Sequence, residues 1–106
     1  MVPAVDGHDF LVSTAWRKKR EKILKRDGYQ CQLAKRYGKN VPAYAVHHIF
    51  PRDEFPQYAL ADWNLISVSA EAHKKLEGEN GLTEKGIELL RRVARKNGIE
   101  IPNCYR

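Results

Sequence analysis

The sequence feature that most constrains the fold is a set of imidazole and carboxamide side chains in the middle of the chain. Two adjacent histidines, His47 and His48, stand near the end of an apolar segment that Pro51 closes. Asn64 follows a loop, and His73 falls within a segment that predicts a short helix. Histidine is the commonest metal ligand and the side chain best suited to accept a proton near neutral pH. A fold that brings these residues together can bind a cation and activate water.

The adjacency of His47 and His48 sets a geometric condition. Successive side chains of a regular strand point to opposite faces, so both imidazoles can reach one ligand only if the strand ends or bulges there. Pro51 is compatible with such an end. One histidine would then bind a cation while its neighbour activates water. The Asn64 carboxamide would hold an imidazole in one tautomer or supply an oxygen ligand.

Segments with clear start and stop signals surround this set. We expect residues 1–12 to form an irregular arm. The sequence then predicts a helix over about 14–27, followed by two extended segments, 29–34 and 41–50, that can pair. A loop over 53–62, with room for one helical turn, leads to an apolar segment over 63–68. Two helices follow, over 70–77 and 84–96. Ser69 and Thr83 are the expected N-caps of the last two helices, and Gly28 and Gly98 are expected stops.

The chain is expected to be one domain. It has 106 residues, 42% of them hydrophobic and 30% charged, which is typical of an ordinary globular protein. Its longest stretch without Asp, Glu, Lys or Arg is Asn40–Pro51, shorter than the ~20 residues that span a bilayer. Residues 1–9 lack a basic region followed by an apolar one, so we expect no signal peptide. We therefore expect a cytoplasmic protein that does not enter membranes.

The charge of the chain favours a polyanionic partner. Lys and Arg total 19 against 13 acidic residues, a formal net charge of +6. This excess does not by itself distinguish nucleic acid from an anionic membrane. Trp16 is expected to anchor the first helix in the core, and seven cations crowd the rest of that helix, where they could simply be solvated: Arg17, Lys18, Lys19, Arg20, Lys22, Lys25 and Arg26. Arg91, Arg92, Arg95 and Lys96 form a second basic cluster.

At the histidines the sequence resembles a known family. Val46-His47-His48-Ile49 followed by Pro51, Asn64-Leu65-Ile66 and His73 together resemble the motif of the HNH endonucleases. Trp16 and residues 23–31 are similar to the lead-in of small phage and bacterial members, so the resemblance covers about residues 14–77. It implies an α+β fold with a ββα-metal (His-Me finger) core over about 28–77. The basic N-terminal helix and a packing helix over about 83–97 would flank that core.

The resemblance also implies roles for the four residues. His48 would be the general base that takes a proton from the water attacking phosphorus. His47, where many family members have Asp, and His73 would bind one divalent cation, and Asn64 would orient His48 or help to hold the metal. We expect Mg²⁺ or Mn²⁺, with Ni²⁺ or Zn²⁺ possible, to stabilise charge on the phosphate. Asp53 and Asp62 could contact the metal through water, but loop carboxylates are usually only solvated.

The chain departs from the family at the cysteines. Many relatives bind a structural zinc through two Cys-X-X-Cys pairs, which would fall at 31 and 34 and at 69 and 72. Here only Cys31 is a cysteine, because Ala34, Ser69 and Ala72 occupy the other positions. Structural zinc needs four ligands, so we expect none. Cys31 then becomes a small buried hydrophobic residue and Cys104 a thiol of the tail.

We expect the C-terminal helix to replace the missing zinc. Ile87, Leu90, Val93 and Ala94 lie on one stripe of the helix. If fully buried, each of the three larger residues supplies about 1.5–3 kcal/mol before conformational entropy is counted. Deletion of residues 82–106 should then unfold the domain.

Three functions remain at this point. The sequence favours a metal-dependent DNA endonuclease that contacts DNA mainly through phosphates, with phage packaging proteins as possible partners. The alternatives are a nucleic-acid-binding or phage assembly module without catalysis and a basic protein-interaction domain. The complete histidine and asparagine set favours the enzyme, because a pure binding module has no need of it.

Overall fold

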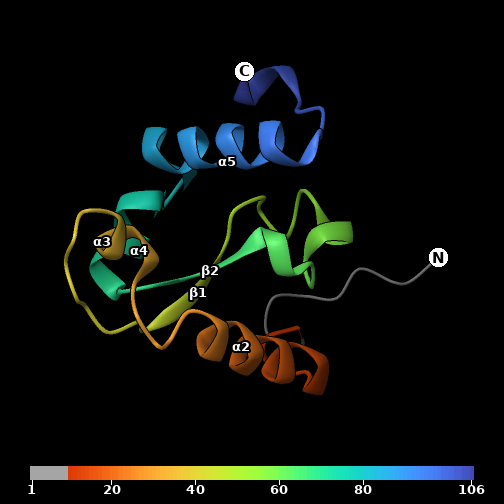
Figure 1. The fold of residues 1–106 in the computed structure, drawn as a ribbon. Coiled ribbons are helices and arrows are strands. Elements are labelled where there is room, and N and C mark those ends of the chain that lie inside the picture. Colours follow the sequence, from red (N-terminus) through yellow and green to blue (C-terminus); the bar gives the residue numbers. More distant parts are fainter. Residues whose placement is uncertain (1–9) are drawn as a thin grey trace.

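The chain folds around a two-stranded antiparallel hairpin with helices on both of its faces (Figure 1). The structure is a computed structural model that describes residues 10–106. Most of the expected irregular arm, including His8, lies outside this range, and Phe10 and Leu11 at its end are helical. Strand β1 spans Ala45–His48 and strand β2 spans Leu65–Val68. Their register pairs His47 with Ile66 and His48 with Leu65.

The hairpin joins different segments from those that the sequence indicates. The predicted pairing of 29–34 with 41–50 is wrong except for an isolated bridge between Gln30 and Pro42. Helix α3, Gln32–Arg36, replaces the second half of the first segment, because Gln, Leu, Ala, Lys and Arg all favour helix. The second segment contributes only β1, which takes its partner from the apolar segment predicted over 63–68.

Helix α2, Thr14–Arg26, covers one face of the hairpin and confirms the helix predicted at 14–27. The Ser13 side chain accepts a hydrogen bond from the Trp16 N–H at 3.1 Å and caps the helix. Trp16, Ile23 and Leu24 are buried in one cluster with Val46 and Leu65 of the hairpin. The predicted role of Trp16 as a core anchor is therefore confirmed.

The C-terminus of α2 is tied directly to β2. The Asp27 carboxylate accepts hydrogen bonds from the Ser67 N–H at 3.0 Å and from the Arg26 side chain at 2.9 and 3.0 Å. Gly28 follows with φ +64°, a left-handed conformation that glycine adopts without strain, so the helix stops where the sequence predicts. Asp27 thereby links the end of α2 to β2.

Helices α3 and α4 pack on the opposite side of the hairpin, and α5 packs against α4 (Figure 1). Helix α4 spans Ala70–Leu76, and α5 spans Glu84–Asn97. Ser69 and Thr83 cap them as predicted, and Gly98 ends α5 in the left-handed region. The short strands β3, Glu77–Gly78, and β4, Gly81–Leu82, join the two helices as a small hairpin.

The predicted apolar stripe of α5 is partly wrong. Leu90 and Ala94 are buried as expected, but Leu89 completes the buried face, while Ile87 and Val93 are only half-buried. The reason lies at Gly86, where a Cβ would come within 2.1 Å of the Leu76 carbonyl oxygen. Because α5 meets the end of α4 through this side-chain-free position, the face of α5 that is buried includes Leu89 rather than Ile87.

The remaining segments close the core over the long loop. Two 3₁₀ turns, Pro56–Tyr58 and Asp62–Asn64, occur where one helical turn was expected. A third 3₁₀ turn, Asn103–Tyr105, follows α5, and the Tyr105 hydroxyl donates to the Glu54 carboxylate at 2.6 Å. Ile99 and Ile101 fold back against the main core. Cys31 is buried in that core, and Cys104 is exposed, as the sequence indicates.

Candidate metal centre and catalytic site

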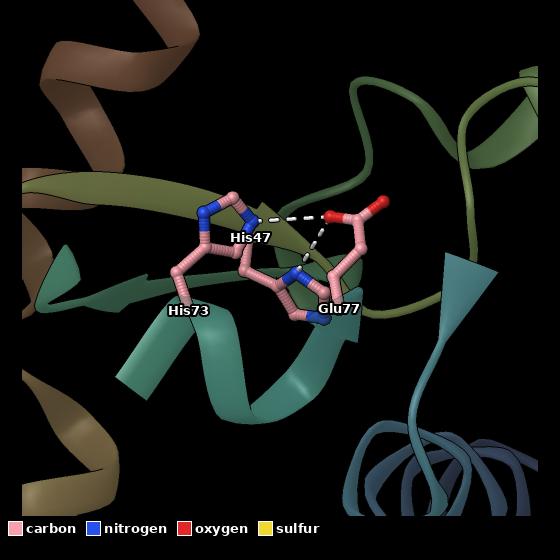
Figure 2. A group of neighbouring side chains, drawn as sticks. All are labelled: His47, His73 and Glu77. Atoms are coloured by element: carbon pink, nitrogen blue, oxygen red, sulfur yellow. Dashed lines mark hydrogen bonds and ion pairs between the residues drawn. The ribbon is translucent and has the colours of Figure 1, made fainter. Parts of the chain in front are cut away.

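Two imidazoles and one carboxylate converge where β1 meets the C-terminal end of α4. His47 points from β1 towards α4, and its ring centroid lies 5.3 Å from that of His73. Glu77 follows directly after α4, and its carboxylate oxygen lies 3.1 Å from His73 Nε2 and 3.9 Å from His47 Nδ1. Figure 2 shows both rings directed at this carboxylate. The three residues offer ligand atoms within 4.8 Å of one another and could form a metal site.

His47 is buried without a hydrogen bond. Its side chain is 1% exposed, and neither Nδ1 nor Nε2 hydrogen-bonds to any group within residues 10–106. Burial, reinforced by the nearby His73 and His48, lowers the pKa of His47 to about 3. A neutral imidazole is the form that binds a metal, so this unpartnered buried ring fits a ligand position.

Sequence reasoning missed Glu77. The available signal is its spacing from His73, because residues four apart lie on one face of a helix. Glu77 also occupies the C-cap position of α4, where the backbone turns to the extended conformation of β3. This placement directs the carboxylate of an exposed residue at the buried ring of His47.

His48 lies on the opposite face of β1, against α2. Its ring stacks on Trp16 with centroids 4.9 Å apart, and Phe10 approaches edge-on at 5.9 Å. His48 Nε2 lies 3.0 Å from the Ala59 carbonyl oxygen. A carbonyl can only accept, so this nitrogen carries the hydrogen and Nδ1 is left as the acceptor.

The pKa of His48 reflects the same surroundings. Burial lowers it to about 4; the bond to Ala59 opposes this shift, and the charge of Arg52 reinforces it. His48 is therefore a neutral imidazole at physiological pH. β1 also ends at His48, but the two rings lie on opposite faces of the strand, His47 against His73 and Glu77 and His48 against Trp16 and Ala59.

Asn64 does not touch either histidine through its side-chain hydrogen bonds. It is fully buried, and its Oδ1 accepts from the Phe50 N–H at 2.6 Å. Its Nδ2 donates to the carbonyl oxygens of Phe50 at 3.2 Å and Tyr58 at 3.1 Å. Asn64 thus holds Phe50 at the start of the loop and Tyr58, the residue before Ala59, whose carbonyl is the acceptor for His48.

The basic residues of α2 divide into two groups. Lys19 and Lys22 pair with Asp62 at 2.5 and 2.9 Å, and these bonds lower the pKa of that carboxyl to about 2. Arg20 donates to the Tyr44 carbonyl, and Arg26 donates to the carbonyls of Asp62 and Leu65. The remaining three cations are exposed and make no hydrogen bond or ion pair within residues 10–106: Arg17, Lys18 and Lys25.

Cys31 lies where the first family cysteine would be. Burial raises the pKa of its thiol, but hydrogen bonding from the Ala34 backbone, from Ser69 and from the Leu33 backbone outweighs burial and leaves the pKa below 9.0. The residues at 34 and 69 therefore still surround Cys31. The apolar side chains of α5 and the tail pack against this region.

The comparison with solved structures confirms the family resemblance. The chain is similar to the HNH endonuclease of the deep-sea thermophilic bacteriophage GVE2, crystallised with a manganese ion. The two share 28% sequence identity over 80% of this chain and 83% of the other, with a TM-score of 0.63. No protein-family model and no curated protein matches the sequence. The fold is therefore that of an HNH-type endonuclease, an α+β architecture with a ββα core.

No helix within residues 10–106 is long and apolar enough to cross a membrane.

Proposed function

We propose that this protein is a metal-dependent DNA endonuclease that hydrolyses phosphodiester bonds. The observation that carries the proposal is the buried, unpartnered ring of His47 facing His73 and Glu77. A buried polar group without a partner is costly in a folded protein, and a cation held by the three side chains would remove that cost. The similarity to a manganese-bearing endonuclease supports the same reading.

His47, His73 and Glu77 would hold the divalent ion. Two imidazoles and one carboxylate suit Mn²⁺ better than Mg²⁺, which prefers oxygen ligands, and Ni²⁺ or Zn²⁺ also fits this set. When bound, the ion would stabilise charge on the phosphate and on the departing oxygen. The low pKa of His47 keeps the ring free of a competing proton.

His48 would act as the general base. The Ala59 carbonyl fixes the hydrogen on Nε2, so Nδ1 is the atom that accepts a proton from water. Trp16 stacks on the ring and restricts its rotation. Asn64 would act as a positioning residue, because it holds the loop that carries Ala59.

The seven cations of α2 would provide the positive surface for the DNA backbone. Arg17, Lys18 and Lys25 are the exposed members without an internal partner, so they are the ones best placed to meet phosphates. Binding should then weaken steeply with salt and depend little on sequence. Residence in the cytoplasm of a bacterial or phage-infected cell and contact with phage packaging proteins remain predictions from the resemblance.

Plasmid cleavage tests the proposal. The protein should cut with Mn²⁺ and not with excess chelator, and the series should include Mg²⁺, Ni²⁺ and Zn²⁺. His48→Ala should lower the rate by about 10²–10⁴-fold while DNA binding in chelator is retained. Glu77→Gln should require more metal for the same rate. Glu79→Gln, the same change at an exposed residue outside the metal site, is the matched control.

Two results would contradict the proposal. Cutting that survives His48→Ala would remove the general base. Salt-dependent DNA binding without cleavage under any of the four metals would favour the non-catalytic binding module instead.

A further inference from the structure

A groove on another part of the surface is not used by the proposed reaction. It is a cavity of about 290 Å³ bounded by α3, α4, α5 and the segment that precedes β1. None of His47, His48, His73 or Glu77 lines it. Its floor is apolar and is formed in part by Leu33, Ala34 and Leu89. We call it the α3–α5 groove.

The rim of the α3–α5 groove is strongly cationic. Five basic residues line it, from the three helices and from the loop that follows α3. Two acidic residues, Glu71 and Glu88, also line it. The basic residues are Arg36, Lys39, Lys75, Lys85 and Arg92. Among the described residues, none of the five lies within 4.0 Å of a carboxylate oxygen, so their charges are not neutralised inside the protein.

This combination selects one class of ligand. Unpaired cations around an apolar hollow complement a ligand that carries carboxylates on either side of an apolar group. A volume of about 290 Å³ is at the low end for ligand cavities, so it accommodates one or two side chains rather than a large molecule. The sugar–phosphate backbone of DNA would satisfy the cations but offers no comparable apolar group for the floor.

We propose that the α3–α5 groove binds a segment of a partner protein in which acidic residues flank a large apolar side chain. The apolar side chain enters the hollow between Leu33 and Leu89, and the carboxylates meet Lys75 and Arg92 at the rim. The groove is separate from the metal centre, so this proposal does not depend on the nuclease proposal.

Peptide selection on the full-length protein provides the test. A library of random peptides is displayed on phage and selected on the immobilised chain, and enriched peptides are synthesised for fluorescence anisotropy. We expect enriched sequences to combine Asp or Glu with Leu, Phe or Trp. The double variant K75E/R92E should weaken binding by about tenfold or more, because it reverses two charges at the rim.

A matched pair isolates the groove from general charge effects. K74E/R95E makes the same charge change on the same two helices, at exposed residues that do not line the cavity, and should leave affinity within about twofold. Ala34→Leu fills the floor without changing charge and should weaken binding in a protein whose thermal unfolding is unchanged. Equal weakening by both double variants, or no effect of Ala34→Leu, would overturn the proposal.

Competition between the selected peptide and DNA decides which of the two anionic ligands the groove binds. A short DNA duplex should not displace the selected peptide, and in ¹⁵N-labelled protein the peptide should shift amide signals of α3, α4 and α5. Failure to enrich any acidic and apolar peptide would refute the proposal. Displacement by the duplex, with the same amides shifted, would assign the groove to DNA and refute it as well.

Discussion

Substitution of Asn64 tests whether this residue organises the loop that contacts His48, the proposed general base. Asn64 is fully buried, and its amide makes three hydrogen bonds to the backbone of Phe50 and Tyr58. Asn64→Ala would leave these backbone groups without their partner. At about 1 kcal/mol for each lost bond, the free energy of unfolding should fall by about 3 kcal/mol.

The corresponding change in melting temperature is large enough to measure clearly. For a domain of this size, about 3 kcal/mol corresponds to a fall of roughly 12–20 °C. Circular dichroism of metal-free protein gives the melting temperature. Asn80→Ala, at an exposed asparagine, is the control and should melt like the unchanged protein. A fall of less than about 1 kcal/mol for Asn64→Ala would refute the reasoning, because the three bonds would then be energetically replaceable.

Three further predictions concern stability. Gly86→Ala should destabilise the protein by about 1–3 kcal/mol, although alanine normally favours helix, because its Cβ meets the Leu76 carbonyl. Gly78→Ala, whose Cβ would make only ordinary contact with Thr83 Cγ2 at 3.9 Å, is the control in urea unfolding. Asp27→Asn should destabilise the protein at neutral pH. The pKa of Asp27 in the folded protein is lowered, so its contribution to the free energy of unfolding is present above the pKa of the unfolded chain and disappears as pH falls through the folded pKa. Urea titrations at several pH values would show this loss. Deletion of residues 82–106 should abolish cooperative thermal unfolding, and a truncated protein that melts like the full chain would contradict the packing role of α5.

The sequence predicted those parts of the fold that local signals determine. Ser69, Thr83 and Gly98 mark helix ends through their own side chains or backbone freedom, and the structure places the ends there. The predicted meeting of His47 with His73 is also found. These features depend on short-range chemistry or on a spacing that a known family shares.

The errors arose where tertiary contacts decide. Nothing local shows that β1 pairs with 65–68 rather than with 29–34, because both segments are apolar and extended in pattern. The burial of Leu89 rather than Ile87 on α5 follows from the close approach at Gly86, which involves a backbone ten residues away in the chain. Glu77 was missed because an exposed glutamate after a helix resembles any solvated side chain until His47 is seen beside it.

The location of bound manganese tests the central claim most directly. Crystals grown with Mn²⁺ and measured at the manganese absorption edge should give an anomalous peak within bonding distance of His47, His73 and Glu77. The same peak should be absent or weak in crystals of Glu77→Gln grown at limiting metal. A peak elsewhere, with the ring of His47 still unpartnered, would contradict the account.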